Sequence, residues 1–158
     1  MTRPGDPAPA REAWLLSLIR PDLRPYAERA PLALPSVTAL LERIGNPHRG
    51  LRCIHIAGSK GKGSVALMTE AILQHAGLRT GTFTSPHLER WSERIRIDGH
   101  EVSGDRFDEA LGVLKPEVAW LTAANPDNPP SFFDTLTAAA LWLFKKHDVD
   151  LAIVETGI

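Results

Sequence analysis

A stretch rich in glycine and lysine constrains the fold of this chain more than any other part of the sequence. A short apolar segment at 53–57 leads into three glycines and two lysines, and an apolar periodic run follows at 65–73. This order predicts a strand, a phosphate-binding loop and a helix that opens at Ser64. Glycines let backbone N–H groups turn toward an anion, and the amino end of a helix adds partial positive charge. We therefore expect this loop to bind phosphate.

The loop departs from the common Walker pattern, in which the lysine is followed directly by serine or threonine. Here Gly63 separates Lys62 from Ser64, and Ile56 stands where that pattern has its first glycine. Because a lysine in this position neutralises the outer phosphates, we predict that Lys62 binds them. The predicted ATP-binding residues are Gly58, Ser59, Lys60, Gly61, Lys62, Gly63 and Ser64.

Composition limits the kind of protein that the rest of the chain can form. The chain has 158 residues, 43% of them hydrophobic, and a formal net charge of -1. We expect one domain preceded by a loose tail at 1–10. Near-neutral charge argues against a partner that is nucleic acid or an anionic membrane. No apolar run approaches the roughly 20 residues that span a bilayer, and no signal-peptide core is present, so a cytoplasmic location is expected.

The single cysteine, Cys53, falls within the first predicted strand. A cysteine in such a place is more often a small buried hydrophobe than a nucleophile, and one cysteine cannot form a disulfide framework. We therefore expect Cys53 to be buried.

Apolar periodicity and turn residues predict the remaining elements. A strand, a helix and a strand within about thirty residues form a βαβ unit, so the core strands should be parallel. The two earliest helices need not touch nucleotide, and packing beside the sheet is the interpretation that the sequence favours for them. The helix that begins at 103 is expected to break at Pro116 and to resume as far as Leu121. By range, the predicted elements are helices at 13–19, 36–44, 103–114 and 132–146, strands at 79–83 and 150–154, and a hairpin at 93–102 around Asp98 and Gly99.

Polar residues follow two of these strands at the edge where parallel strands end. Ser85 and His87 come after the second strand, and Glu155 comes after the third. Nucleotides bind at the carboxyl ends of such strands, where a hydroxyl or a carboxylate can ligate Mg²⁺. The alternatives are that Ser85 is an ordinary turn residue and that Glu155 is an exposed strand end. We expect Lys62, Ser64, Ser85 and Glu155 to surround one locus.

Several motifs now become recognisable together. They are the loop at 55–64, Thr-Ser-Pro-His-Leu at 84–88, Glu-Arg-Ile-Arg-Ile at 93–97, Ser-Phe-Phe-Asp at 131–134 and Val-Glu at 154–155. In this combination they closely resemble the folylpolyglutamate synthase/dihydrofolate synthase family, relatives of the Mur ligases. The resemblance implies an α/β fold of the P-loop NTPase type, as in the Mur ligase central domain. Its mostly parallel sheet would be flanked by helices and truncated after about the third core strand.

The resemblance also implies an activity. Such a protein is an ATP-dependent ligase that adds L-glutamate to dihydropteroate, to folates or to both through an acyl phosphate, with ATP and Mg²⁺ as cofactors. Carried over to this sequence, Lys62 and Glu155 would be catalytic, and Ser85 and Glu155 would bind Mg²⁺. The pterin or folate would contact Pro31, Leu32, Ala33, Leu34, Ser131, Phe132, Phe133 and Asp134.

Members of this family continue beyond the corresponding glutamate into further strands and a separate glutamate-binding domain. We therefore expect 11–158 to be the N-terminal portion of the ATP-binding domain. The chain alone should then be inactive, because the C-terminal part needed for activity is missing. Two alternatives stay open: a different Mur-type amino-acid ligase, and a non-catalytic nucleotide-binding module.

Overall fold

The computed structural model describes residues 10–19 and 34–157, with the side chains placed from residue 13 onward. The predicted tail lies outside this part of the chain, except that Ala10 begins the first helix. The predicted substrate residues Pro31, Leu32 and Ala33 also lie outside the described residues.

A five-stranded sheet with the order β1-β5-β2-β3-β4 forms the centre of the fold. The first three strands in this order are parallel, and the hairpin adds to them antiparallel, so the predicted mostly parallel sheet is confirmed. β5 lies between the two strands of the βαβ unit. The strands are β1 (Cys53–Ile56), β2 (Thr80–Phe83), β3 (Ile95–Ile97), β4 (His100–Glu101) and β5 (Leu151–Glu155).

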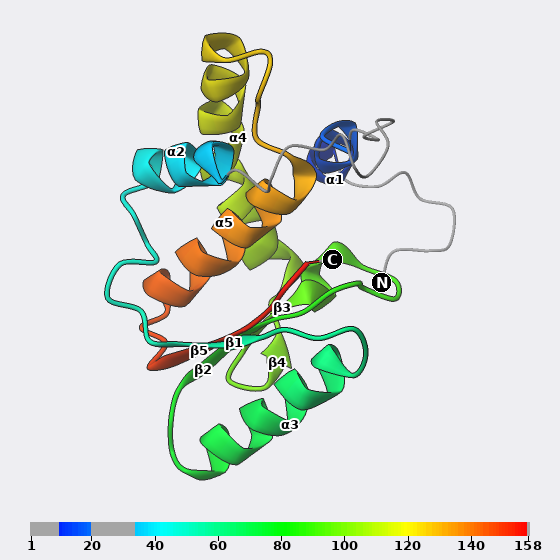
Figure 1. Ribbon diagram of the computed structural model, residues 1–158, viewed down its shortest axis with the longest axis vertical. Helices are drawn as coiled ribbons and strands as arrows, with labels where there is room; N and C mark the ends of the chain where they lie inside the picture. Colours follow the sequence, from blue (N-terminus) through cyan, green and yellow to red (C-terminus); the bar gives the residue numbers. More distant parts are fainter. Residues whose placement is uncertain (1–9, 20–33, 158) are drawn as a thin grey trace.

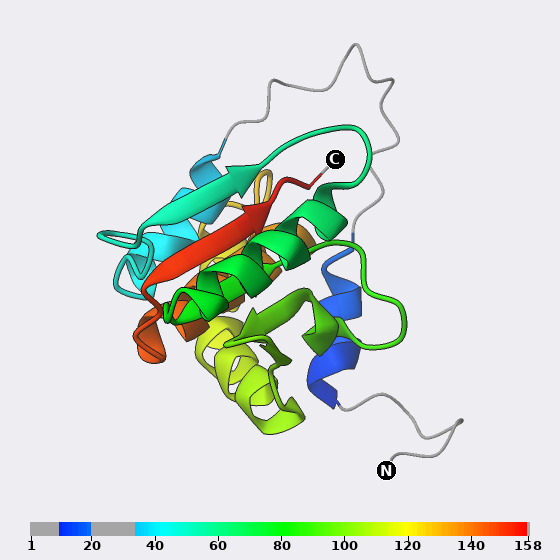
Figure 2. The ribbon, with the colours of Figure 1, turned by 90° about the horizontal axis from the view of Figure 1, so that it is seen from below.

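Helices cover the two faces of the sheet unequally, as Figures 1 and 2 show. One face carries α3 (Lys62–His75), which follows the glycine-rich loop. The opposite face carries α1 (Ala10–Ser17), α2 (Pro35–Arg43), α4 (Gly104–Ala124) and α5 (Phe132–Lys146). None of the helices in the described part of the chain combines the length and apolar character needed to cross a bilayer.

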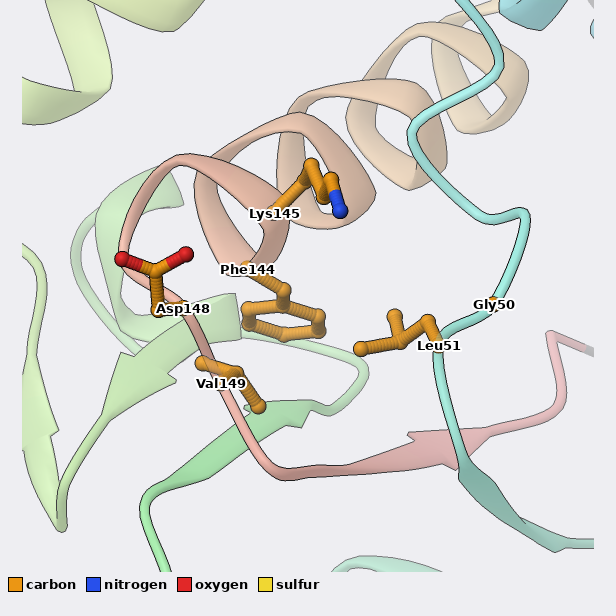
Figure 3. Close-up of a pocket in the computed structure, with 6 residues that line it drawn as sticks. All are labelled: Gly50, Leu51, Phe144, Lys145, Asp148 and Val149. Atoms are coloured by element: carbon orange, nitrogen blue, oxygen red, sulfur yellow. The ribbon is translucent and has the colours of Figure 1, made fainter.

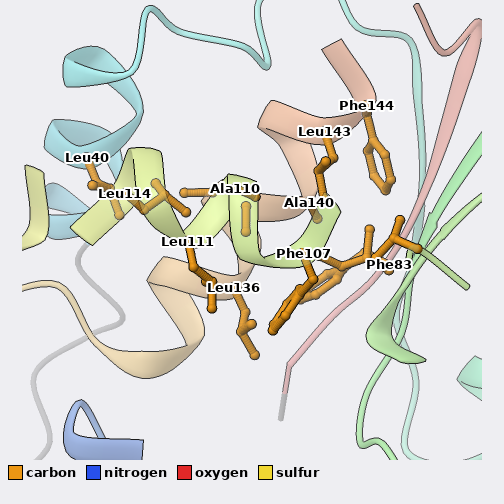
Figure 4. Packing of buried hydrophobic residues seen from close by; sticks show 14 of the residues in the cluster. Leu40, Phe83, Phe107, Ala110, Leu111, Leu114, Leu136, Ala140, Leu143 and Phe144 are labelled. Atoms are coloured by element: carbon orange, nitrogen blue, oxygen red, sulfur yellow. The ribbon is translucent and has the colours of Figure 1, made fainter. Parts of the chain in front are cut away.

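The hydrophobic core lies between α4, α5 and the sheet (Figure 4). Phe83 of β2 and Phe107 of α4 are almost fully buried there. α5 approaches β2 so closely that a Cβ at Gly81 would overlap the ring of Phe144. Glycine at this position therefore allows the helix to pack directly on the strand.

Two local predictions are wrong. Cys53 is exposed, because β1 lies at the edge of the sheet, where β5 is its neighbour. Pro116 does not break α4, which continues through it. A proline removes one helical hydrogen bond, but buried residues on both sides, Leu114 and Val118, hold the two halves of the helix in the core.

The hairpin turn is confirmed. Asp98 and Gly99 both have positive φ, 48° and 76°, as a two-residue turn that follows the twist of the strands requires. The helix after the glycine-rich loop begins at Lys62, two residues before the predicted start at Ser64.

Candidate functional site

The glycine-rich loop leaves β1 at its carboxyl end and runs into α3. Ser59 and Lys60 are exposed in this loop, and Gly61 has the left-handed conformation (φ 74°) at the N-cap of the helix. Gly63 and Ser64 lie in the first helical turn. No side chain caps this amino end by a hydrogen bond, so its N–H groups and partial positive charge are available to an anion.

Lys62 folds back across the loop. Its ammonium donates a hydrogen bond to the carbonyl oxygen of Gly58 at 3.0 Å, and it lies 3.7 Å from a carboxylate oxygen of Glu155. The positive charge thus stands between the loop and the end of β5.

Glu155 connects the three strand ends. It is the last residue of β5, and its side chain is only 3% exposed, so it is not an exposed strand end. The backbone N–H of Ser85 donates to its Oε2 at 2.9 Å, while Oε1 faces Lys62. The structure therefore joins Lys62, Ser85 and Glu155, three of the four residues that the sequence placed at one locus, and Ser64 lies in the first turn of α3.

A cleft of about 920 Å³ opens beside Glu155. Four of the predicted substrate residues line it, namely Leu34, Ser131, Phe133 and Asp134. Phe133 lies 5.8 Å from Phe83, between ring centroids. Phe132 does not line the cleft. Its ring packs edge to face against Trp91, with the ring centroids 4.8 Å apart.

Asp134 has a structural partner that the sequence interpretation missed. Its carboxylate accepts hydrogen bonds from the Ser131 backbone N–H at 2.8 Å and from the Ser36 hydroxyl at 3.0 Å. The Ser131 hydroxyl in turn accepts from the Asp134 N–H, which completes a capping box at the start of α5. The spacing Ser-x-x-Asp was the signal that could have revealed this cap.

A turn between β2 and β3 carries a cation that sequence reasoning left without a role. Arg94 is buried, lines the cleft, and donates through Nε to His87 Nδ1 at 3.0 Å. Its guanidinium lies over the rings of Trp91 and Phe132, at 5.7 and 5.5 Å from their centroids. Burial lowers the pKa of Arg94, which the charge of Glu155 opposes.

His87 is held as a neutral acceptor in this arrangement. Burial lowers its pKa first, and the charge of Arg94 lowers it further. Its ring also packs against Trp91, with centroids 4.1 Å apart. An imidazole that accepts a hydrogen bond at Nδ1 carries its proton on Nε2.

Glu93 closes the loop that carries these side chains. Its carboxylate accepts hydrogen bonds from the backbone N–H groups of Leu88, Glu89 and Arg90, at 2.8, 3.0 and 2.8 Å. These donors lower the pKa of Glu93, those of Leu88 and Arg90 most strongly. One carboxylate therefore organises the turn that leads to Arg94.

Another pocket, of about 180 Å³, lies at the opposite ends of the strands (Figure 3). Gly50 and Leu51 precede β1, and Asp148 and Val149 precede β5, so this pocket is at the amino ends of both strands. Lys145 lines it as well. It is separate from the cleft beside Glu155.

Comparisons with known proteins agree with this arrangement, although no family model matches the chain. A Bacillus subtilis relative named dihydrofolate synthase/folylpolyglutamate synthase is 35% identical over 119 residues, which are 75% of this chain and 28% of the relative. The folylpolyglutamate synthase of Mycobacterium tuberculosis complexed with ADP superposes with a TM-score of 0.80 at 36% identity, over 93% of this chain and 31% of that chain. The chain is thus similar to the N-terminal part of members of the folylpolyglutamate synthase/dihydrofolate synthase family.

An FPGS–AMPPCP–folate complex of the same family superposes with a TM-score of 0.81 at 31% identity, over 94% of this chain and 34% of that chain. The chain spans less than a third of the length of the curated family members that it matches first. It corresponds to the N-terminal part of folylpolyglutamate synthases.

Proposed function

We propose that the chain contributes the nucleotide-binding and pterin-binding part of an ATP-dependent ligase. This ligase would join L-glutamate to dihydropteroate, to folates or to both. The proposal is based on the position of Glu155. Its carboxylate lies beside Lys62 of the glycine-rich loop, and Glu155 also lines the cleft that contains Phe83 and Phe133. The structural similarity of the chain to a folylpolyglutamate synthase complexed with ADP and to an FPGS–AMPPCP–folate complex supports the proposal. Because the chain spans about a third of those chains, we propose the activity for a longer protein of which 11–158 is the N-terminal portion of the ATP-binding domain.

The chemistry needs anions to be brought together. A carboxylate oxygen of the acid attacks the γ-phosphorus of ATP, and ADP leaves. The amine of glutamate then attacks the acyl carbon of the acyl phosphate, phosphate leaves, and the amine loses a proton. We assign residues 58–64 to the phosphates, because the uncapped amino end of α3 and the Lys62 ammonium offset the negative charge there.

The donor set fits a Mg²⁺ ion that binds together with ATP. Mg²⁺ in phosphate-transfer sites commonly takes one or two protein ligands, and phosphate oxygens and waters complete its shell. Glu155 offers a buried carboxylate, and Ser85, whose backbone N–H donates to that carboxylate, carries a hydroxyl. Among the residues whose positions are known, no group of three or more His, Cys, Asp or Glu side chains could hold a metal ion. We therefore assign Mg²⁺ to Ser85 and Glu155 when ATP is present, where it would neutralise phosphate charge.

We assign the pterin or folate to the cleft beside Glu155. Phe133 offers a flat ring on which a pterin can stack, and Leu34, Ser131 and Asp134 line the same cleft. A cytoplasmic location, where ATP is available, belongs to the same proposal.

Binding and turnover of the purified chain test the proposal. By isothermal titration calorimetry, we expect saturable binding of ATP that tightens when Mg²⁺ is present, and binding of dihydropteroate or pteroate. We expect no incorporation of labelled glutamate by the chain alone. A folded chain that binds no ATP would contradict the proposal, and glutamate-dependent release of ADP would contradict the assignment to one part of a ligase.

The same measurements distinguish the two alternatives. A different Mur-type ligase would bind ATP and no pteroate. A non-catalytic module would bind ATP tightly in the absence of Mg²⁺ and would be indifferent to pteroate.

A further inference from the structure

A buried guanidinium faces the cleft beside Glu155 without a carboxylate partner. Arg94 ends the 3-10 turn Trp91–Arg94, is 8% exposed, and lines the cleft. Burying a cation costs free energy unless an opposite charge or several acceptors meet it. Throughout 34–157, no carboxylate forms an ion pair with Arg94.

The surroundings of Arg94 leave most of its donors unused. A guanidinium has five N–H donors. In the described chain, the acceptor that meets one of them is Nδ1 of His87. Glu93, the adjacent carboxylate, is occupied by three backbone N–H groups, and Glu155 acts on Arg94 from a longer distance. The remaining donors are available to a ligand in the cleft.

The wall around Arg94 is aromatic. Trp91 and Phe132 stack on the guanidinium from outside the cleft, while Phe83 and Phe133 line the cleft itself. The phosphate loop, with Lys62, does not line this cleft. The arrangement therefore suits an acid with a flat aromatic group better than it suits a phosphate.

We propose that Arg94 binds the carboxylate of an aromatic acid in the cleft beside Glu155. A guanidinium matches a carboxylate in shape and can hold both of its oxygens, which fixes the orientation of the acid. This inference rests on the proposed function and deepens it, since the carboxylate at Arg94 would be the one that ATP activates. Arg94 is thus a substrate-binding residue.

A first experiment tests the anion site without any pterin. In a protein labelled with ¹⁵N-arginine, the Arg94 Nε–H resonance is identified by its absence from the Arg94→Lys variant. We expect benzoate to shift this resonance saturably and benzamide, which has the same ring and no charge, to leave it in place. Equal shifts with both compounds, or no shift with benzoate up to its solubility limit, would overturn the proposal.

A second experiment uses pteroate and its primary carboxamide. We expect the wild-type chain to bind the acid at least about tenfold more tightly than the amide, the size of one charge-assisted hydrogen bond. Arg94→Gln should remove this preference and leave ATP affinity unchanged. Arg79→Gln is the matched control, because Arg79 precedes β2 at the opposite end of the strand, is 50% exposed, and pairs with Asp98 away from the cleft. It should keep the preference.

The outcomes separate this inference from the proposed function. If the preference for pteroate persists in Arg94→Gln, the role of Arg94 is overturned and the ligase assignment stands. If pteroate does not bind but benzoate shifts the Arg94 resonance, the assignment of a pterin substrate to this cleft is contradicted, whereas the assignment of Arg94 as a carboxylate-binding residue is supported. If Arg94→Gln does not fold, the benzoate and benzamide titrations of the wild-type chain still decide.

Discussion

Two loops leave the carboxyl ends of parallel strands at this site, and they are ordered in opposite ways. The phosphate loop after β1 is exposed, and the side-chain hydrogen bond to its backbone comes from Lys62. The loop after β2 is tied together by its own side chains. Glu93 accepts three backbone N–H groups, and Arg90 and Ser92 both donate to Glu101.

This difference indicates that the two loops are ordered by different interactions, one by its ligand and the other by its own side chains. A loop with little internal support gains contacts when an anion enters it, so part of the binding free energy orders the loop. A loop with its own supports keeps its side chains in place before the ligand arrives. The loop after β2 therefore presents Ser85, His87 and Arg94 in a fixed arrangement, whereas the phosphates that we assign to the glycine-rich loop would complete it on binding.

Lys62→Ala should have the largest effect on ligand binding. Losing a charged hydrogen-bond donor at the phosphates costs ~3 kcal/mol, so ATP affinity should fall by about 100-fold. The variant should still fold, but its thermal midpoint should fall, because the buried carboxylate of Glu155 loses the ammonium that lies 3.7 Å from it. Calorimetric titration with ATP and a thermal melt followed by circular dichroism check the two expectations.

Lys145→Ala is the matched control for this prediction. Lys145 is an exposed lysine that lines the pocket at the amino ends of the strands, away from the phosphate loop. The Lys145→Ala variant should bind ATP with the affinity of the wild-type chain. Unchanged ATP affinity in a folded Lys62→Ala variant would show that the phosphates bind elsewhere.

Glu93→Gln should act on the second loop and spare the first. A neutral amide cannot accept three backbone N–H groups as a carboxylate does, so the amides of Leu88, Glu89 and Arg90 should exchange with solvent several-fold faster. ATP binding without Mg²⁺ should be almost unchanged, whereas the gain in affinity on adding Mg²⁺ should shrink, because Ser85 is on this loop. Hydrogen exchange followed by NMR and calorimetry measure the two effects.

Glu89→Gln removes the same charge from the same loop and serves as the control. The Glu89 side chain is 80% exposed and contacts Arg90 without meeting any backbone N–H. If both variants speed exchange equally, the carboxylate of Glu93 is not what orders the loop.

Local patterns made much of the fold predictable. The Asp98-Gly99 turn and the boundaries of α5 depend on residues close in sequence, and both were found. The place of β5 between β1 and β2 depends on strand pairing between distant residues, which no local pattern contains. The exposure of Cys53 has the same origin, because an edge strand looks like a central one until its neighbours are known.

The candidate site was predictable only where one residue type determines the chemistry. Lys62 and Glu155 stand out because a lysine in a glycine-rich loop and a carboxylate after an apolar strand have few other uses there. Arg94 was missed because its character comes from burial against Trp91 and Phe132, which lie on separate segments. At an alternating position of a predicted hairpin, an arginine is ordinarily an exposed residue.

Acidification should produce the smallest effect, since it changes the second loop without a substitution. Backbone donors lower the pKa of Glu93 in the folded chain. The stability that the Glu93 carboxylate gives to this loop is therefore fully present above the ordinary pKa of about 4.3, and it is lost as the pH falls through the lower pKa of the folded chain. The amide resonances of Leu88 and Arg90 should therefore titrate together below that ordinary value. Other carboxylates titrate in the same range, but the Glu93→Gln variant separates them, because only the step that belongs to Glu93 should disappear from it. A step at or above the ordinary value would mean that the three N–H groups do not stabilise the Glu93 carboxylate, and the contrast between the two loops would fail.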